Sequence, residues 1–499
     1  MKKNVLLITS DQQHWNTIGM FNPEISTPNL DRLIERGTYF DRAYTVNPTC
    51  TPTRASLITG KYPSQHGAWT LGTKLMETEH TIGEDLIANG YRTELIGKAH
   101  FQPLNSTEEY SSLEATDIVG DMDFWKNFNE NFYGFENIKL TRNHTTENHV
   151  GQHYVLWMES KGYKSWRNHF EAPVGTLDPN KKYVWNIPEE YHYNTWITEE
   201  TNNSLERYVE NNENFFLWTS FFDPHPAYFV PEPWASMYSP DKITIPEGLT
   251  DKEKQYLSPF HKISQELEPD TLEFEKSGFA LHGVHCHICS EEILRKNLAI
   301  YYGMISMLDH YIGKIIEKTE QLGIRDNTLI IFTTDHGHFV GQHGLTAKGP
   351  FMYEDLIRVP LITSLPNTIP ENKISNSMQS LVDIMPTILD YCNIPIPDGV
   401  AGISQKDVWD AKKDKLRTYA ICEHNHERNS INLRTYIFER YKITIYMNME
   451  YGEIFDLEND PNELDNLWSN KELKLELMNK ALQAEMDREP HFMPRIADA

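Results

Sequence analysis

The sequence predicts an α/β fold, because strand-like apolar runs alternate with helix-like segments through most of its 499 residues. Residues 5–9, 215–221 and 328–333 are largely apolar runs of the kind found in strands that are buried on both faces. Residues 93–96 form a shorter run of the same type. Between the second and third runs, residues 293–322 carry apolar side chains at helical spacing, which indicates a long amphipathic helix.

The end of the chain predicts a small α+β domain. A last sheet helix is expected to begin at residues 383–386, and residues 394–399, with two prolines and a glycine, have the composition of a linker. The elements predicted beyond this linker are two strands and one helix: residues 435–444, 453–457 and 471–486. We therefore expect one large domain over residues 1–395 and a small one over residues 400–499.

The middle of the chain, residues 108–194, is rich in Trp, Tyr, His and Asn and has little regular periodicity. We expect it to form insertions over the sheet, where α/β folds place specificity. Its aromatic side chains are suited either to stacking on sugar or aryl rings or to filling a core.

The composition excludes several classes of protein. A formal net charge of −26 argues against a general binder of nucleic acid or of anionic membranes. The first apolar run is too short for a signal peptide, and no later run approaches a membrane span. The five cysteines are widely spread and odd in number, which is typical of a reducing compartment, so we expect a cytoplasmic protein.

The most informative run begins at Cys50 and predicts a short helix with an anion site at its start. Thr51 is expected to cap this helix, Pro52 suits its first turn and Gly60 can end it. Cys50 would then lie where free N–H groups and the helix dipole favour an anion. Arg54, one turn further on, can fork two hydrogen bonds onto an oxyanion.

Polar residues follow each predicted strand of the sheet. Because parallel strands end at one edge of a sheet, we expect these residues to converge on one crevice together with Cys50. The polar runs at the four strand ends are Asp11-Gln12, Gly97-Lys98-Ala99-His100, Asp223-Pro224-His225 and Asp335-His336-Gly337.

Asp11, Gln12, Asp335 and His336 form an oxygen-rich set with one imidazole. Such a set suits one hard divalent cation, most simply Ca²⁺ or Mg²⁺, and the histidine also admits Mn²⁺. Each aspartate taken alone is more commonly a cap or turn residue, so the prediction depends on the set as a whole.

The run Cys50-Thr51-Pro52-Thr53-Arg54 resembles the Cys-x-Pro-Ser-Arg signature of the type I sulfatases, with Thr53 in place of the common serine. Further motifs that resemble this family occur in order along nearly the whole chain: Thr27–Leu33, Gly60–Gly67, Gly97–His100, Asp335–Gly337, Gly341–Gly344, Lys348-Gly349, Arg358–Pro360 and Gly452–Leu467. The resemblance implies an alkaline-phosphatase-like fold, with a large, mostly parallel sheet flanked by helices. It also implies hydrolysis of a sulfate ester.

The same resemblance implies a role for each site residue. A maturation enzyme converts the cysteine of the signature, here Cys50, to formylglycine, whose hydrated aldehyde is the nucleophile and whose oxygen completes the metal shell. Arg54, Lys98 and Lys348 would hold the sulfate oxygens. His225 would protonate the leaving oxygen, and His100 would remove a proton from the second hydroxyl to regenerate the aldehyde.

Gln12 departs from the Asp-Asp pair of many members and resembles the subgroup that contains phosphonate monoester hydrolases and some cytoplasmic sulfatases. Phosphonate monoester or phosphodiester hydrolysis therefore stays open beside sulfate hydrolysis. A third alternative is an inactive protein that binds sulfated ligands. Substrate identity, a sugar included, metal identity and oligomeric state are also left open.

Two histidine-rich runs fall outside the family motifs. Residues 282–289 (His-Gly-Val-His-Cys-His-Ile-Cys) contain five side chains that could bind zinc, but no second half-site follows, so a loop that contacts substrate is the preferred interpretation. The run from His424 to Arg428 either reaches the active site from the C-terminal domain or forms a polar turn.

Overall fold

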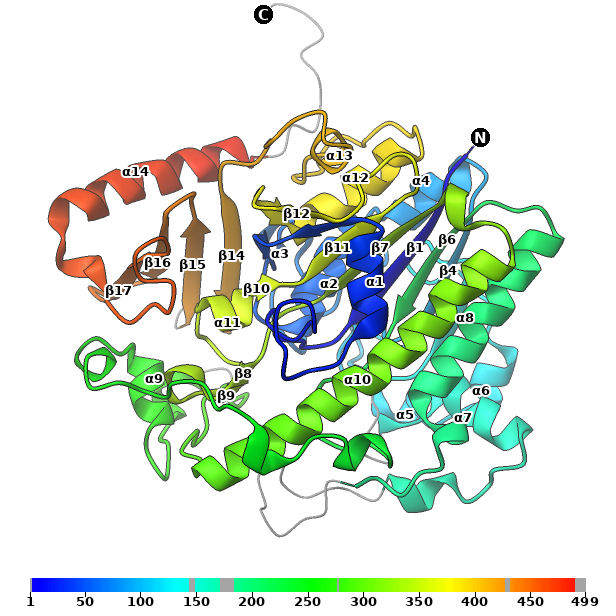
Figure 1. Cartoon of the computed structure of the whole chain (residues 1–499), viewed down its shortest axis with the longest axis horizontal. Coiled ribbons are helices and arrows are strands. Elements are labelled where there is room, and N and C mark those ends of the chain that lie inside the picture. Colours follow the sequence, from blue (N-terminus) through cyan, green and yellow to red (C-terminus); the bar gives the residue numbers. More distant parts are fainter. Residues whose placement is uncertain (1, 143–148, 171–183, 276–277, 427–430, 490–499) are drawn as a thin grey trace, which may run out of the picture.

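An eight-stranded sheet forms the centre of the computed structural model, which describes residues 2–142, 149–170, 184–275, 278–426 and 431–489 (Figure 1). The strands lie in the following order across the sheet: β12 (Lys373–Ser375), β2 (Thr38–Phe40), β11 (Leu361–Ser364), β7 (Thr328–Thr334), β1 (Asn4–Ser10), β6 (Phe215–Ser220), β4 (Arg92–Gly97) and β5 (Asn137–Leu140).

The centre of this sheet is parallel, as the sequence predicts. Strand β1 pairs in parallel with both β6 and β7, and β4 pairs in parallel with β6 and β5. Only at the β11 side do antiparallel pairs occur, where β11 runs against β7 and β2. The four strands predicted from apolar runs thus all place their carboxyl ends at one edge.

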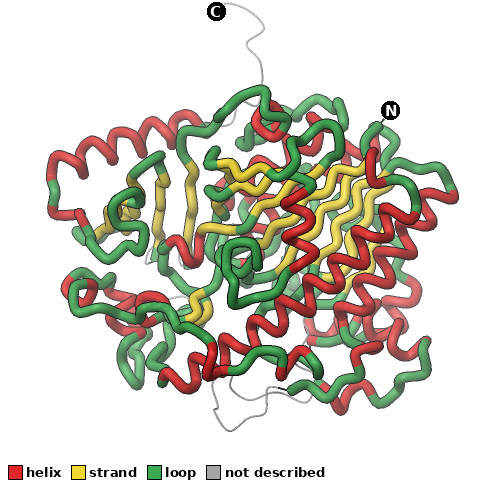
Figure 2. The backbone as a smooth tube through the Cα atoms, in the orientation of Figure 1, coloured by secondary structure: helices red, strands yellow, loops and turns green. Residues whose placement is uncertain are grey.

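Helices cover both faces of the sheet (Figure 2). Leu6 and Ile8 of β1 pack on one side, and Val5 and Leu7 pack on the other, as the alternation of a strand requires. The helices of the first face are α1 (Pro28–Glu35), α7 (Gln152–Ser160), α8 (Tyr193–Glu210) and α10 (Glu291–Gln321). Those of the second face are α2 (Cys50–Thr59), α4 (Ile82–Ala88) and α12 (Ile384–Tyr391).

The long helix predicted at residues 293–322 is α10, and the sheet helix expected from residue 383 is α12, so both predictions are confirmed. Ser290 caps α10, since its side chain accepts a hydrogen bond from the backbone N–H of Ile293. Among the described residues, no helix combines the length and the apolar character that crossing a membrane requires.

The C-terminal sheet is a four-stranded antiparallel unit covered by α14 (Lys471–Asp487) (Figure 1). Its strands are β14 (Ala420–Asn425), β15 (Asn432–Ile437), β16 (Tyr441–Tyr446) and β17 (Gly452–Asp456). The single strand predicted at residues 435–444 is wrong, because the chain turns back between β15 and β16. Phe438 donates its N–H to the carbonyl of Tyr441 at 2.8 Å and closes that turn.

The middle segment is more regular than predicted. It supplies α5 (Thr116–Val119), α6 (Met122–Asn127), α7 and the edge strand β5, although residues 143–148 and 171–183 lie outside the described part. The remaining short helices and strands are α3 (Pro63–His66), α9 (Pro259–Ser264), α11 (Glu354–Ile357), α13 (Lys406–Trp409), β3 (Ala43–Tyr44), β10 (Arg358–Val359), β13 (Gln379–Ser380), β8 (Phe339–Val340) and β9 (Thr346–Ala347).

Candidate active site

The predicted convergence of strand ends occurs. Asp11 follows β1, Lys98 follows β4 and Asp335 follows β7, and all three side chains meet at the first residue of α2, Cys50. We call the following residues the Cys50 cluster: Cys50, Asp11, Arg54, Lys98, Asp335, His336 and Lys348. The structure therefore brings together seven residues that the sequence had singled out for a site.

Helix α2 begins one residue earlier than its predicted cap. Thr49 is the N-cap residue, with extended backbone angles, and Thr51 lies inside the helix with its hydroxyl unpartnered in the described structure, so the prediction that Thr51 caps the helix is wrong. Gly60 ends the helix as predicted. Its φ of 64° is left-handed, and its N–H reaches the carbonyl of Ser56.

Cys50 is buried, with 1% of its surface exposed, and two lysines and one neutral histidine lie close to its sulfur. The Sγ atom lies 3.1 Å from Lys348 Nζ, 3.3 Å from His336 Nε2 and 3.8 Å from Lys98 Nζ. Burial and the nearby Asp11 carboxylate raise the pKa of the thiol above its ordinary value. The unmodified side chain is therefore a protonated thiol at neutral pH, which is a poor nucleophile.

Arg54 is fully buried, and most of its donors are used within the protein. Its Nε donates to Asp335 at 2.9 Å, while Nη1 donates to the hydroxyl of Ser220 at 2.7 Å and to the carbonyl of Lys98 at 3.0 Å. Nη2 has no hydrogen-bond partner among the described residues. The predicted fork of two hydrogen bonds from Arg54 onto an oxyanion stays a prediction, and Nη2 is the nitrogen left for it.

The carboxylates of the cluster are held in their ionised form. Burial alone raises the pKa of Asp11, but the charges of Lys98 and Arg54 outweigh burial and lower it below its usual range. Asp335 behaves in the same way, since His336 and Arg54 offset burial and the charge of Asp11. The cluster thus combines fixed negative and positive charges in one dry space.

The donor set fits a divalent cation. One ligand atom from each of Asp11, Cys50, Asp335 and His336 lies within 4.8 Å of the others, and the described residues contain no other such group. His336 donates Nδ1–H to the carbonyl of Gly337 at 2.9 Å, so Nε2 carries the free lone pair. Gln12 Oε1 is buried and has no partner in the described structure, as a further oxygen ligand requires.

The two histidines with predicted proton-transfer roles lie at neighbouring strand ends. His100, half-buried after β4, has a left-handed φ of 62° and donates its backbone N–H to Glu114 at 2.9 Å. Burial, together with the charges of Arg142 and Lys98, lowers its pKa well below the ordinary value, so the ring is neutral. His225 is half-buried after β6, and its Nδ1 meets the carbonyl of Pro226.

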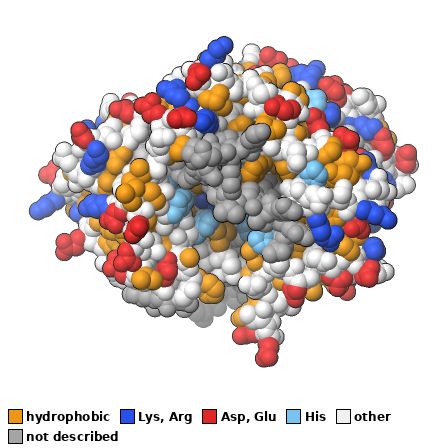
Figure 3. Space-filling model, turned by 90° about the horizontal axis from the view of Figure 1, so that it is seen from below, with side chains coloured by type: hydrophobic (Ala, Val, Ile, Leu, Met, Phe, Trp, Pro, Cys, Tyr) orange, Lys and Arg blue, Asp and Glu red, His pale blue; other side chains and the backbone are white. Residues whose placement is uncertain are grey.

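The histidine-rich loop does not gather into a second metal group among the described residues. Both nitrogens of His287 are used within the protein, at 3.1 Å from the hydroxyl of Thr346 in β9 and 3.1 Å from the carbonyl of Gly283. His282 approaches Lys348 and His336 of the Cys50 cluster, and His424 is a neighbour of His282, whereas Arg428 lies outside the described residues. Seen from below, several histidine side chains gather around a hollow in the surface (Figure 3).

Three supporting residues are not predicted from the sequence. Ser220 holds Arg54, and His338 and Tyr228 support Gln12 through a chain of hydrogen bonds. His338 stands two residues after His336, which was the available signal, but Ser220 and Tyr228 reach the site only through the pairing of β6 with β1.

The comparison with known families confirms the resemblance. The sulfatase family matches residues 3–394, and the C-terminal region of N-sulphoglucosamine sulphohydrolases matches residues 341–490. An arylsulfatase from Clostridium perfringens is 30% identical over 98% of this chain and 95% of its own length.

Two solved structures share the fold over nearly the whole chain. A phosphonate monoester hydrolase from Silicibacter pomeroyi has a TM-score of 0.79 at 20% identity, covering 98% of this chain and 96% of its own. A second structure, in complex with its substrate D-glucosamine-2-N,6-O-disulfate, has a TM-score of 0.70 at 20% identity and covers 98% of each chain. With the family match over residues 3–394, the chain belongs to the sulfatase family of sulfuric ester hydrolases.

Proposed function

We propose that this protein hydrolyses the sulfate monoester of a small hydroxylated compound, with residue 50 as the nucleophile. The observation that carries the proposal is the burial of Cys50 at a helix start, between the Asp11, Asp335 and His336 donors on one side and Lys98 and Lys348 on the other. The carboxylates and the imidazole can bind a metal cation, and the two lysines can bind the sulfate group that reacts next to that cation.

Residue 50 is proposed to be formylglycine, formed from Cys50 by a maturation enzyme that this protein needs as a partner. The modified residue supplies a hydroxyl nucleophile in place of a thiol whose raised pKa keeps it protonated. Asp11, Gln12, Asp335 and His336 are proposed to hold one Ca²⁺, which supplies a positive charge that favours the ionised nucleophile and polarises the sulfate. Elemental analysis distinguishes Ca²⁺ from Mg²⁺ and Mn²⁺.

The protein's own cations stabilise the charge of the reacting group. Lys348 and Lys98 lie within 4 Å of the nucleophile position, and the unpartnered Nη2 of Arg54 lies 3.7 Å from Asp11 in the same space. As the ester bond lengthens, negative charge grows on the leaving oxygen and the sulfuryl oxygens, and fixed cations offset it without reorganisation.

The two histidines divide the proton transfers. His225 donates a proton to the leaving alcohol oxygen, because it stands at the end of β6 on the edge where the site opens. His100 accepts a proton from residue 50 in the second half of the reaction, for which its neutral ring is suited.

Hydrolysis of a phosphonate monoester is the second candidate, and Gln12 is the observation that favours it. With the neutral amide of Gln12, the metal ligands carry less negative charge than an Asp-Asp pair would. This changes the net charge of the site and hence the substrate charge that it can offset. The structural likeness to a phosphonate monoester hydrolase, at 20% identity, concerns the fold.

The test is a side-by-side assay of protein co-expressed with a maturation enzyme, with peptide mass spectrometry to confirm conversion of Cys50. We expect kcat/KM for aryl sulfate and sugar sulfate to exceed that for aryl phosphonate. A higher kcat/KM for the phosphonate would replace the first candidate by the second. Converted protein that turns over none of these substrates would refute both.

We also propose that the protein works in the cytoplasm. All five cysteines are free thiols in the structure, which supports a reducing compartment. Fractionation of the source cells with an antibody to this protein would test the location.

A further inference from the structure

His424 is a buried imidazole without a partner. Only 3% of its surface is exposed, and neither ring nitrogen has a hydrogen-bond partner among the described residues. Leaving such a group unpaired costs about 1–3 kcal/mol. A buried ring whose two nitrogens lack a partner among the described residues is therefore available to bind a polar group of a ligand.

The position of His424 on β14 places it on the face of the strand that packs against the loop of His282. Along the strand, Glu423 lies on the face toward α14, where it pairs with Arg488, whereas Cys422 packs in the cluster that contains Leu281 and Phe351. Alternation places His424 on the same face as Cys422.

Strand β14 is also tied to the segment that precedes the nucleophile. The backbone N–H of Glu423 donates to the carbonyl of Val46 at 2.8 Å, and the Asn47 side chain donates to the carbonyl of Glu423 at 2.6 Å. Only two residues separate Asn47 from Cys50 in the sequence, so the C-terminal sheet is fixed close to the segment that carries the nucleophile.

His282 has neighbours both in the Cys50 cluster, namely Lys348 and His336, and in β14, namely His424. The loop that carries it packs backbone to backbone on Lys348, since a Cβ added to Gly283 would lie 2.2 Å from the Lys348 carbonyl oxygen and 2.4 Å from Gly349 Cα. The His282 side chain is exposed at the surface. The protein that packs around its ring and the positive charge of Lys348 both disfavour the imidazolium, so its pKa lies below the ordinary value.

We propose that His282 and His424, the histidine wall, bind hydroxyl groups of the alcohol that carries the sulfate, so that the preferred substrate is a sulfated sugar. A neutral imidazole offers one N–H donor and one acceptor nitrogen, which matches a hydroxyl group. An aryl ring or a quaternary ammonium has no such partner. This inference rests on the proposed function and adds its substrate class.

The test compares kcat/KM for glucosamine 6-sulfate and for 4-nitrophenyl sulfate in His424→Phe and His282→Phe. We expect a roughly 10- to 100-fold loss on the sugar sulfate, mostly in KM, and little change on the aryl sulfate. His424→Gln, which keeps a donor and an acceptor, should recover part of the loss. Melting temperatures verify that each variant folds.

Equal losses on both substrates, or no loss on the sugar sulfate, would overturn the inference. Wild-type protein that hydrolyses aryl sulfate but no sugar sulfate would overturn the inference and leave the proposed function standing. Wild-type protein that hydrolyses neither sulfate would overturn the proposed function itself.

A different observation carries a second inference, about the orientation of Gln12. The Gln12 Nε2 lies 2.8 Å from His338 Nδ1, and His338 Nε2 lies 2.5 Å from the hydroxyl of Tyr228. Because Nδ1 faces an amide N–H, it must accept, so Nε2–H of the neutral ring donates to Tyr228. This chain leaves the Gln12 Oε1 as the free end of the amide.

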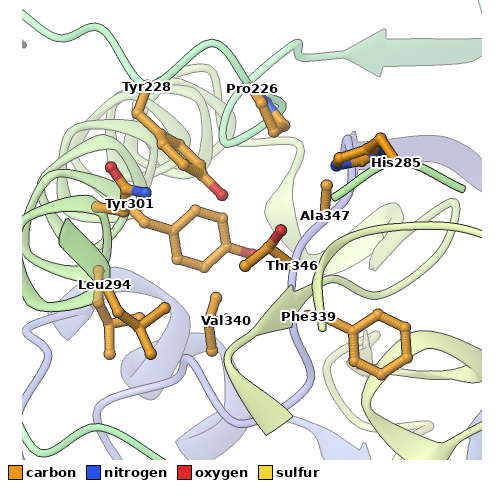
Figure 4. Close-up of a pocket in the computed structure, with 11 residues that line it drawn as sticks. Pro226, Tyr228, His285, Leu294, Tyr301, Phe339, Val340, Thr346 and Ala347 are labelled. Carbon is orange, nitrogen blue, oxygen red and sulfur yellow. The ribbon is translucent and has the colours of Figure 1, made fainter. Parts of the chain in front are cut away.

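Tyr228 belongs to an aromatic pocket that fixes this chain in place. Figure 4 shows Tyr228 and Tyr301 on one side of the pocket and His285 on the other. The Tyr301 ring stacks on His338 with centroids 4.9 Å apart, and its hydroxyl donates to the Gln12 carbonyl at 2.9 Å. Both ends of Gln12 are thus anchored from this pocket.

We infer that His338 and Tyr228 are positioning residues that hold the Gln12 Oε1 toward the cation. Calorimetric titration of the metal-stripped full chain with Ca²⁺ tests this without any turnover. His338→Phe should raise the Kd roughly 10- to 100-fold, and Tyr228→Phe should raise it less. Tyr302→Phe is the control: it removes a neighbouring hydroxyl of α10, which accepts a hydrogen bond from Asn22 and not from the Gln12 chain. This variant should leave the Kd unchanged.

An unchanged Kd in folded Tyr228→Phe and His338→Phe would overturn this inference. If His338→Phe does not fold, the Tyr228→Phe titration decides alone, because that variant loses only a hydroxyl group. A Kd raised equally in Tyr302→Phe would show a general loss of packing and would also overturn it.

Discussion

The Cys50 cluster and the histidine wall are neighbours, but their polar groups are partnered differently. In the cluster, nearly every charge has a counter-charge from the protein within 4 Å, as between Arg54 and Asp335 or Lys98 and Asp11. In the wall, His424 has neither a counter-charge nor a hydrogen bond from the described residues. Fixed charges suit the sulfate group, which is the same in every substrate. Unpaired neutral donors and acceptors suit the hydroxyl groups of the alcohol, which differ from one substrate to another.

The two regions also come from different parts of the fold. The cluster is supplied by the ends of parallel strands, by α2 and by Lys348, which follows β9. The wall is supplied by a loop outside the family motifs and by the first strand of the C-terminal sheet. The reaction is thus set by the central sheet, and we expect substrate choice to be set by what packs against it.

The largest expected effect is loss of the nucleophile. Cys50→Ala should lower kcat/KM roughly 10⁴-fold or more on every sulfate ester, because no other side chain stands at the start of α2. Initial rates on aryl and sugar sulfates measure this. Cys392→Ala removes another buried cysteine and should keep full activity. More than a trace of turnover in a clean Cys50→Ala preparation would contradict the mechanism.

Removal of the acid should depend on the leaving group. His225→Ala should lower kcat/KM roughly 10²- to 10³-fold for sugar sulfates and much less for 4-nitrophenyl sulfate, whose phenolate departs without a proton. His100→Ala should instead release one equivalent of alcohol per site in a burst, followed by slow sulfate release. Stopped-flow detection of both products decides. A burst with the His225 variant alone would mean that the two roles are reversed.

A single carboxylate tests the cluster as a cation site. Asp335→Asn keeps the shape of the side chain but removes a charged ligand, so Ca²⁺ affinity and activity should fall together, roughly 10- to 100-fold. Asp223→Asn is the matched control, because Asp223 is equally buried at a strand end and burial raises its pKa to about 7. Its titration with Ca²⁺ should match wild type. Active protein with no metal by elemental analysis would refute the site.

The central strands and the cluster could be predicted because their signals are local. Strands buried on both faces, such as β1, are continuous apolar runs, and the polar residues of the site follow them directly. Strand β14 was missed, since its sequence Ala-Ile-Cys-Glu-His-Asn mixes buried polar groups with apolar ones. The turn at Phe438-Glu439-Arg440 carries no glycine, proline or asparagine, so β15 and β16 were merged.

Contacts between distant segments could not be predicted from the residues that make them. Thr51 was expected to cap α2 on its residue type, but the chain enters the helix at Thr49. The partners of Arg54 depend on how β6 and β7 flank β1, and this pairing decides that Ser220 and Asp335 each accept one of its hydrogen bonds. Neither the start of α2 nor the partners of Arg54 can be predicted from the spacing of residues within a motif.

The smallest expected effect on catalysis comes from His343, a buried histidine that is paired with two carboxylates. Such carboxylate partners are what the histidine wall lacks among the described residues. His343 is buried, with Nδ1 2.5 Å from Glu253 and Nε2 3.6 Å from Asp355. Burial opposes its charge, but the two carboxylates raise its pKa to about 9. Because this value lies above that of the unfolded chain, the stabilisation is complete below pH 6.5 and is lost as the pH rises through about 9.

His343→Gln should therefore lower the free energy of unfolding by about 3 kcal/mol at pH 6 and by much less at pH 9.5. Urea unfolding at both values measures the difference, and the exposed pair of His80 with Glu84 provides the control variant His80→Gln, with almost no effect at either pH. A loss that is the same at both values would mean that His343 stabilises by packing on Tyr353, whose ring lies 3.7 Å away, and not by charge. A loss of stability confined to the lower pH would show that His343 stabilises the fold through its charge. Replacement of His424 should instead change substrate preference and leave the pH dependence of stability unchanged.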